Sequence, residues 1–249
     1  MANRVALVTG AAAGIGAACS KRLAQDGIAV GVLDLDAERC AETVEAIKAN
    51  RGDAVALGAD ISDRAQVKAA VAKLRAEFGP VTIVVNNAGV TDFTPFEEIT
   101  EERWEFVYRI NVLGQIIVTQ EVLPDMKKEH WGRIVNISSS SAQTGSVNMA
   151  TYSSSKGAIV TLTRTLAQEL GPFGITVNNI PPGSVFGTIM SEASRDKMPM
   201  PAEVLQAMLP VRRMGEPNDI ANACAWLCSE HSGYVTGQTI GVNGGRVVS

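Results

Sequence analysis

Short apolar, β-branched runs alternate with longer amphipathic stretches along almost the whole chain, and this alternation restricts the folds it can adopt. The runs predict seven strands, at residues 5–8, 29–33, 54–58, 82–86, 133–137, 175–180 and 239–242. Helical patterns lie between them, at about residues 15–26, 37–49, 64–78, 101–128, 152–170 and 218–228. Nearly continuous apolar strands separated by helices are typical of a parallel sheet covered on both faces. We therefore expect an α/β fold with a doubly wound sheet that binds ligands at the carboxyl ends of its strands.

The alternation continues without a proline- or serine-rich linker or an internal repeat, so we expect one domain over residues 1–249. The exception is an insertion at about residues 184–210, before the last predicted strand. It holds Phe186 and four methionines, which are Met190, Met198, Met200 and Met208. Long insertions near a site are often lids, and methionine suits adaptable apolar contacts. An ordinary surface excursion is the alternative.

The composition excludes several classes of protein. Hydrophobic residues make up 46% and charged residues 19% of the 249 residues, as in globular proteins. A net charge of −4 without a cluster of Lys or Arg argues against nucleic-acid binding. No apolar run approaches the ~20 residues of a membrane span, and the first residues carry no signal-peptide pattern. We expect a cytoplasmic protein that contacts neither membrane nor nucleic acid.

Four cysteines are scattered along the chain, at Cys19, Cys40, Cys224 and Cys228, which suits a reducing compartment. Cys224 and Cys228 share a face of one predicted helix, with His231 nearby. No second group of ligands is available to complete a tetrahedral metal site. We therefore interpret these cysteines as small buried hydrophobes and expect no metal.

A glycine-rich turn with Gly10, Gly14 and Gly16 follows the first predicted strand and opens the first predicted helix. Glycine lets the backbone approach a pyrophosphate closely, and the helix N-terminus offers free N–H groups and the positive end of its dipole. Asp34 ends the second strand twenty residues after Gly14, where a carboxylate hydrogen-bonds a ribose and repels a 2′-phosphate. No cation lies in the turn, so the pattern favours NAD over NADP. A structural turn and a strand-end cap are the alternatives.

Two further polar segments follow strand ends. Asp60 and Ile61 follow the third strand, in a position to meet an adenine, and residues 86–89, Asn-Asn-Ala-Gly, follow the fourth. Both segments are equally compatible with ordinary turn chemistry.

Tyr152 and Lys156 are four residues apart in a predicted helix and therefore share one face. An ammonium beside a phenol favours the phenolate and lowers the tyrosine pKa from about 10 toward neutrality. A tyrosine with such a pKa can exchange a proton with an alcohol or carbonyl oxygen. Alone, the spacing is more typical of a solvated helix face without chemistry.

Together these motifs resemble the short-chain dehydrogenase/reductase family, and the match runs almost end to end. The matching residues are Thr9, Gly10, Gly14, Gly16, Asp60, Asn86, Asn87, Ala88, Gly89, Asn111, Ser139, Tyr152, Lys156, Pro182 and Gly183, with the tail segments 213–217 and 236–245. The resemblance implies a Rossmann-type fold and hydride transfer to or from a nicotinamide cofactor.

The resemblance also implies catalytic roles. Tyr152 would be the acid/base, and Ser139, thirteen residues earlier, would orient the substrate oxygen. Four serines occupy residues 138–141, and only the family spacing selects Ser139. Lys156 would lower the tyrosine pKa and bind the nicotinamide ribose, while Asn111 would hold a water that relays protons to solvent.

The cofactor contacts implied by the resemblance come from several segments. They are Gly10, Ala13, Gly14, Ile15, Gly16, Asp34, Asp60, Ile61, Asn87, Ala88, Gly89, Tyr152, Lys156, Pro182, Gly183, Val185 and Thr188. Thr188 lies one residue beyond the usual family position, where Gly187 stands.

The pattern is similar both to 3-oxoacyl-acyl-carrier-protein reductases and to NAD-linked secondary-alcohol dehydrogenases. The acyl-carrier reductases typically use NADPH and carry a basic residue in the glycine turn, whereas this chain has Ala13 there and Asp34 after the second strand. The first hypothesis is therefore NAD(H)-dependent interconversion of a secondary alcohol and a ketone. The alternatives are an NADPH-dependent 3-oxoacyl reductase and a cofactor-binding protein without turnover, although the latter would be expected to lack Tyr152 or Lys156.

We expect the substrate to contact Ser139, Gln143, Met149, Tyr152 and Phe186, a lining that suits a small or medium apolar ketone or alcohol. The family resemblance further implies a homotetramer or homodimer built on paired long helices.

Overall fold

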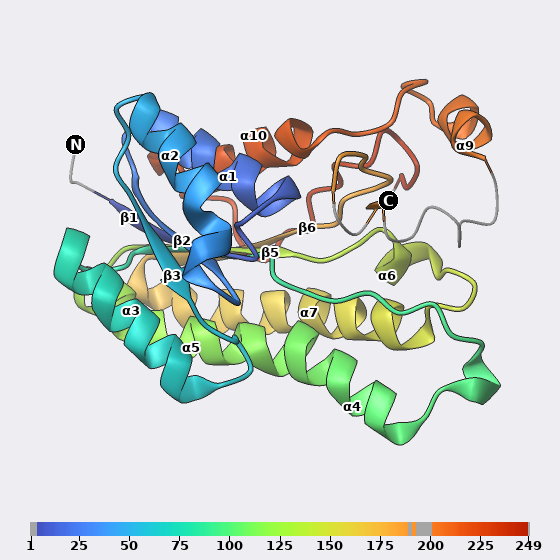
Figure 1. Cartoon of the computed structure of the whole chain (residues 1–249), viewed down its shortest axis with the longest axis horizontal. Helices are drawn as coiled ribbons and strands as arrows, with labels where there is room; N and C mark the ends of the chain where they lie inside the picture. Colours follow the sequence, from blue (N-terminus) through green and yellow to red (C-terminus); the bar gives the residue numbers. More distant parts are fainter. Residues whose placement is uncertain (1–3, 189–190, 193–200, 249) are drawn as a thin grey trace.

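A single parallel sheet forms the centre of the protein. The computed structural model describes residues 4–188, 191–192 and 201–248. The strands of the sheet are β1 (Val5–Thr9), β2 (Ala29–Asp34), β3 (Ala54–Gly58), β4 (Ile83–Asn86), β5 (Gly132–Ile137) and β6 (Ile175–Ile180). They are ordered β3-β2-β1-β4-β5-β6, and every neighbouring pair is parallel. The predicted single-domain, doubly wound α/β fold is confirmed (Figure 1).

Over the described residues the sheet has six strands, so the prediction of about seven is wrong. The segment expected as the seventh strand meets the end of β6 only at isolated bridges, Asn179 with Thr239 and Pro182 with Val242. Proline has no N–H to donate, so Pro181 and Pro182 interrupt the ladder just beyond β6. The two bridges hold residues 239–242 beside the end of β6 and the segment after it, but they do not form a continuous strand ladder.

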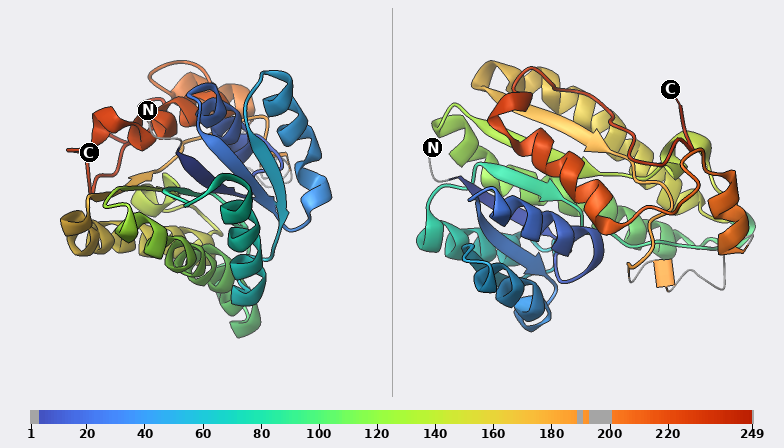
Figure 2. Two further views of the ribbon diagram at one scale, coloured as in Figure 1. Left: turned by 90° about the vertical axis from the view of Figure 1, so that its left-hand side faces the viewer. Right: turned by 90° about the horizontal axis from the view of Figure 1, so that it is seen from above.

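Helices cover both faces of the sheet. The longer ones are α1 (Gly14–Gln25), α2 (Ala41–Ala49), α3 (Arg64–Phe78), α4 (Glu101–Tyr108), α5 (Gln115–Lys128), α7 (Ala150–Leu170) and α10 (Pro217–Cys228). The shorter ones are η1 (Ala37–Cys40), η2 (Phe96–Glu98), α6 (Ser141–Thr144), η4 (Gly171–Phe173), α9 (Ala202–Met208) and η6 (Glu230–Ser232). In Figure 1, α1, α2 and α10 lie above the sheet, and α3, α5 and α7 lie below it; Figure 2 shows the same layers from two other directions. Each layer buries its own apolar cluster, with Leu23 and Ile220 above and Leu74 and Val118 below.

The helix predicted over residues 101–128 is helical throughout but has three parts. A π-helical turn, η3 (Arg109–Gly114), separates α4 from α5. A π turn carries one extra residue per turn and is frequent at functional sites. It holds Asn111, which is fully buried.

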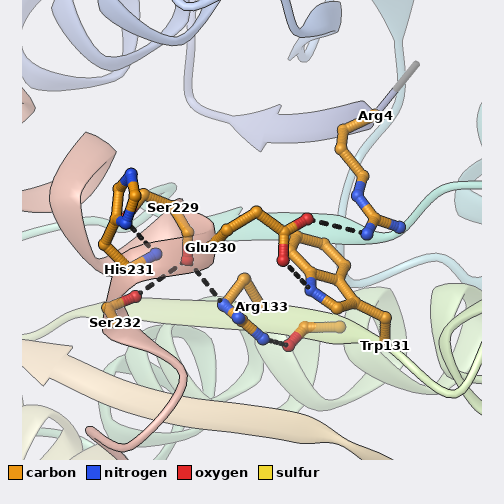
Figure 3. Close-up of polar contacts among 8 residues, drawn as sticks. Arg4, Trp131, Arg133, Ser229, Glu230, His231 and Ser232 are labelled. Carbon is orange, nitrogen blue, oxygen red and sulfur yellow. Dashed lines mark hydrogen bonds and ion pairs between the residues drawn. The ribbon is translucent and has the colours of Figure 1, made fainter. Parts of the chain in front are cut away.

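A cation–aromatic cluster joins distant segments at the amino ends of the strands (Figure 3). The guanidinium groups of Arg4 and Arg133 lie 3.7 and 4.3 Å from the centroid of the Trp131 ring. Glu230 accepts hydrogen bonds from Arg4 at 2.8 Å and from the Trp131 indole at 2.9 Å. These contacts hold the segment after α10 against β1 and β5, at the edge opposite the candidate site.

Three of the cysteines lie together in the core between α1 and α10. Cys19, Cys224 and Cys228 are free and buried, and hydrogen bonds with Cys19 and Cys228, together with burial, raise the pKa of Cys224. His231 is exposed to solvent. Within the described ranges, no three or more His, Cys, Asp or Glu residues gather as a metal site would require. None of the described helices combines the length and the apolar composition needed to cross a bilayer.

Candidate active site

A cavity of about 840 Å³ opens at the carboxyl ends of the strands. Many of the predicted site residues line it: Ile15, Asn87, Gly89, Ser139, Met149, Tyr152, Lys156, Pro182, Gly183, Val185 and Thr188. They come from the first turn of α1, the ends of β4 and β5, helix α7 with the residue before it, and the segment after β6. The fold therefore brings together groups that are far apart in the sequence.

The glycine turn beside this cavity has the shape that a pyrophosphate requires. Gly10 and Gly14 have φ values of +62° and +58°, in the left-handed region that favours glycine. A Cβ on Gly16 would lie 2.2 Å from the carbonyl oxygen of Gly10, so only glycine fits. Ala13 precedes α1 without a side-chain cap, and the first turn of the helix holds no acidic residue. The leading N–H groups of α1 therefore fit the phosphates of a dinucleotide.

Polar side chains tie the turn to the end of β4. The hydroxyl of Thr9 accepts hydrogen bonds from the N–H groups of Asn87 (3.1 Å) and Ala88 (3.0 Å). The Asn87 amide donates to the carbonyls of Thr9 and Gly10, at 3.0 Å each. These bonds fix the floor on which the middle of a dinucleotide would rest.

Asp34 faces the glycine turn. Its carboxylate accepts hydrogen bonds from the N–H groups of Ala12 (3.3 Å) and Leu35 (2.9 Å), and Arg39 forms an ion pair with it at 3.3 Å. An adenosine ribose bound along this turn would meet the carboxylate and Arg39 together.

Asp60 and Ile61 lie farther from the cavity. Asp60 accepts a hydrogen bond from the N–H of Ser62 at 2.8 Å, as in a turn. Ile61 is buried in the core, close to Gly114 of the π turn. Their predicted adenine contacts remain predictions.

Ser139 and Tyr152 both line the cavity, and Tyr152 is only 7% exposed. Burial raises the pKa of Tyr152, and the hydrogen bond with Ser139 lowers it by less. The predicted lowering of this pKa is therefore wrong for the chain without cofactor, where burial raises the pKa of Tyr152. Ser141, which was not predicted, donates both its N–H (3.1 Å) and its hydroxyl (2.9 Å) to the Ser139 oxygen.

Lys156 lies one helical turn after Tyr152 and is 3% exposed. Its ammonium donates to the carbonyl oxygen of Ile137 at 3.0 Å and lies 5.8 Å from the centroid of the Tyr152 ring. Burial lowers the pKa of Lys156 to about 8. The side chain thus links the end of β5 to the face of α7 that carries the tyrosine.

The amide of Asn111 pairs with the backbone of Val90. It accepts from the Val90 N–H at 2.8 Å and donates to the Val90 carbonyl at 2.9 Å and to the Ser155 hydroxyl at 3.0 Å. A Cβ on Gly89 would lie 2.9 Å from the Asn111 oxygen and 3.2 Å from the Lys156 nitrogen. Asn111 and Lys156 therefore both border Gly89, and the proton relay through Asn111 remains a prediction.

A comparison with protein families gives a match over residues 4–199 to the model described as short chain dehydrogenase. The chain belongs to the short-chain dehydrogenase family. Its members are oxidoreductases that bind nicotinamide cofactors, and Ser139, Tyr152 and Lys156 all line the cavity of this chain.

Curated relatives match this short-chain dehydrogenase over nearly its whole length. It is 39% identical to nodulation protein G of Azospirillum brasilense and 37% identical to acetoacetyl-CoA reductase of Cupriavidus necator. It is also 37% identical to a 3-oxoacyl-(acyl-carrier-protein) reductase of Staphylococcus aureus. Each match covers 98% of this chain and 98% of the relative. A crystal structure of a candidate gluconate dehydrogenase from Agrobacterium tumefaciens superposes with a TM-score of 0.92 at 33% identity, covering 98% of this chain and 97% of the other.

A buried carboxylate of the dehydrogenase was not predicted. Asp92, in the loop after β4, is 6% exposed and accepts hydrogen bonds from Arg103 (2.9 Å), Thr94 (3.1 Å) and Thr151 (3.0 Å). Burial raises the pKa of Asp92, but the hydrogen bonds and the charge of Arg103 outweigh it and hold the pKa below its usual value. No sequence pattern connects Asp92 with Thr151, because 59 residues separate them.

Some residues predicted to contact the substrate do not line the cavity of the dehydrogenase. Gln143 is exposed on α6, and Phe186 is half-buried outside the cavity lining. Met208 is 67% exposed at the end of α9. The other methionines of the insertion, Met190, Met198 and Met200, lie outside the described residues.

Proposed function

We propose that this short-chain dehydrogenase interconverts a 3-oxoacyl thioester and the corresponding 3-hydroxyacyl thioester. The observation that carries the proposal is the match, over 98% of both chains, to relatives named acetoacetyl-CoA reductase and 3-oxoacyl-(acyl-carrier-protein) reductase. These relatives support the 3-oxoacyl alternative better than the secondary-alcohol hypothesis. The cavity of about 840 Å³ has room for an acyl chain beside Tyr152.

The hydroxyls of Ser139 and Tyr152, which both line the cavity, would perform the acid/base part of the reaction. The nicotinamide, when bound, supplies or accepts the hydride. In the reduction, Ser139 donates a hydrogen bond to the carbonyl oxygen, and Tyr152 transfers its proton to that oxygen as the hydride reaches the carbonyl carbon. With its pKa above the ordinary value, the Tyr152 phenol carries its proton at neutral pH, as an unperturbed tyrosine also would. After the reaction, the Tyr152 phenolate takes up a proton from solvent along a route that passes the Lys156 side chain.

The proposed cofactor is NAD(H). Asp34 lies against the glycine turn, where its negative charge would accept hydrogen bonds from ribose hydroxyls and repel a 2′-phosphate. The segment from Gly10 to Gly16 contains no Lys or Arg that would offset this repulsion. Arg39 is the nearest cation, and its ion pair with Asp34 competes with phosphate binding.

The experiment is an assay of acetoacetyl-CoA reduction with NADH and with NADPH, followed by the absorbance of the reduced cofactor. A panel of small secondary alcohols with NAD⁺ runs in parallel. We expect turnover of acetoacetyl-CoA at a higher kcat/KM than any simple alcohol. Turnover of the alcohols without any reduction of acetoacetyl-CoA would contradict the proposal and support the secondary-alcohol hypothesis.

The assembly proposed for the enzyme is a homodimer or homotetramer in the cytoplasm. Phe106 on α4 and Leu113 on the π turn are 44% and 43% exposed, which suits a helix-to-helix interface with a second copy. The molar mass in solution, measured by light scattering, tests this, and a monomer would contradict it.

A further inference from the structure

The charged side chains that line the cavity, among the described residues, are both cationic. Among the described residues that line it, Lys156 and Arg246 are cationic, and none is a carboxylate. Lys156 is buried beside Tyr152, whereas Arg246 is exposed, near the end of the chain. A concave site lined by one sign of charge raises the local concentration of ligands of the opposite sign.

The position of Arg246 is built into the fold. The chain before it runs beside the end of β6, where Pro182 bridges to Val242, and the Gly183 N–H donates to the Val242 carbonyl at 3.2 Å. A Cβ on Gly183 would lie 2.8 Å from the Cα of Asn243, so the two segments are in close contact. This contact brings the last turn of the chain to the cavity.

The turn itself is held by Asn243, which is 8% exposed. The Asn243 side chain accepts from the Gly245 N–H at 3.0 Å and donates to the Val247 carbonyl at 3.2 Å. The Arg246 N–H donates to the Asn243 carbonyl at 3.2 Å. The base of the arginine side chain is therefore anchored at a defined point of the cavity wall.

Among the described residues, the guanidinium of Arg246 has one hydrogen-bond partner. One nitrogen donates to the Ser184 hydroxyl at 3.0 Å, and Ser184 also lines the cavity. Within the part of the chain that the structure describes, no carboxylate lies within ion-pair distance of Arg246. A guanidinium presents five donors in a planar fork that matches carboxylate and phosphate groups.

We propose that Arg246 binds an anionic group of the substrate, a carboxylate or a phosphate remote from the carbonyl that is reduced. The cavity then selects 3-oxo substrates that carry a negative charge over neutral ones of the same size. The assumption that the substrate is a 3-oxo compound rests on the proposed function. The charge selection itself rests only on the cavity.

The test compares the unchanged enzyme with Arg246→Met, which keeps an unbranched apolar stem and removes the charge, and Arg246→Lys, which keeps the charge. Two matched substrate pairs are used. Acetoacetyl-CoA carries phosphates and its N-acetylcysteamine analogue does not, and acetoacetate carries a carboxylate that methyl acetoacetate lacks. We expect Arg246→Met to raise KM roughly tenfold for an anionic member, as loss of a charge-assisted hydrogen bond would. The kcat and the constants for the neutral members should stay within about twofold, and Arg246→Lys should recover part of the loss.

The pair that responds identifies the anion. A response to acetoacetyl-CoA alone assigns a phosphate, and a response to acetoacetate alone assigns a carboxylate. An equal loss for neutral and anionic substrates, or no loss for any, overturns the inference. Turnover of acetoacetate without turnover of either thioester would refute the proposed function, and a KM effect of Arg246→Met on acetoacetate would then still support charge selection.

Discussion

The carboxylate of Asp92 accepts a 3.0 Å hydrogen bond from the hydroxyl of Thr151, the residue immediately before Tyr152. The same carboxylate holds Arg103 of α4 and Thr94 of its own loop. Thr91 and Phe93, on either side of Asp92, line the cavity. One buried charge thus connects a wall of the cavity to the start of the helix that carries the proposed acid/base.

Replacing Thr151 with Val removes the hydrogen bond that lies beside Tyr152 while keeping the shape of the side chain. Thr94→Val removes a bond to the same carboxylate farther along the loop and serves as the matched control. Each variant should lower the free energy of unfolding by about 1 kcal/mol. Steady-state assays should show a several-fold lower kcat for Thr151→Val only. Equal kcat losses in both would mean that Asp92 stabilises the fold without positioning Tyr152.

The variant Tyr152→Phe should lose roughly 10²- to 10⁴-fold in kcat, because the proton donor is removed. Binding of the nicotinamide cofactor, measured by calorimetry, should change little, since the ring remains in place. Ser139→Ala should lower kcat as well but leave the tyrosine to act. Turnover of Tyr152→Phe at the rate of the parent would refute the mechanism.

Lys156 should make the stability of the chain without cofactor depend on pH. The pKa of Lys156 is about 8 in the folded chain and 10.5 for an exposed lysine, as in the unfolded chain. Between these two pH values the unfolded chain therefore binds more protons than the folded chain. The penalty for burying the ammonium is complete below pH 8 and is relieved as the pH rises toward 10.5. Relative to Lys156→Met, which cannot titrate, the free energy of unfolding should rise by up to about 3 kcal/mol across this window. Urea denaturation at several pH values measures it, and parallel curves for the two proteins would contradict the buried ammonium.

The strands and most helices could be predicted because each depends on a local pattern. The burial of β1 and β4 on both faces follows from their largely apolar composition. The missing seventh strand has a local cause too, since Pro181 and Pro182 could have been weighed against the pattern at residues 239–242. The apolar run at residues 239–242 indicates a strand only when it is considered without the prolines that follow β6.

The parts of the site that escaped prediction depend on tertiary contacts. A helical pattern does not distinguish a π turn from an α turn, so the geometry that aims Asn111 at Val90 could not be foreseen. The environment of Tyr152 could not be foreseen either, because the depth of burial, rather than the spacing to Lys156, decides the direction of its pKa shift. The motifs predicted which residues belong to the candidate site, whereas the direction of the Tyr152 pKa shift depends on tertiary packing.

The preference for NAD(H) should weaken when Asp34 is replaced by Asn. The amide has the size of the carboxylate but lacks the charge that would repel a 2′-phosphate. Arg39, now 3.3 Å from the carboxylate, would also lose its ion pair and could turn toward that phosphate. We expect the ratio of kcat/KM for NADPH to that for NADH to rise at least tenfold, about 1.4 kcal/mol of differential binding.

The double variant Asp34→Asn with Arg39→Ala separates the two contributions to this shift. If repulsion alone sets the preference, the double variant keeps the whole gain of the single one. If Arg39 also binds the phosphate, its removal should return a large part of the gain, while kcat/KM for NADH stays near the value of the single variant. A parent enzyme that already prefers NADPH would contradict the role given to Asp34, because a carboxylate held beside the turn by the Ala12 N–H would then lie against the phosphate itself.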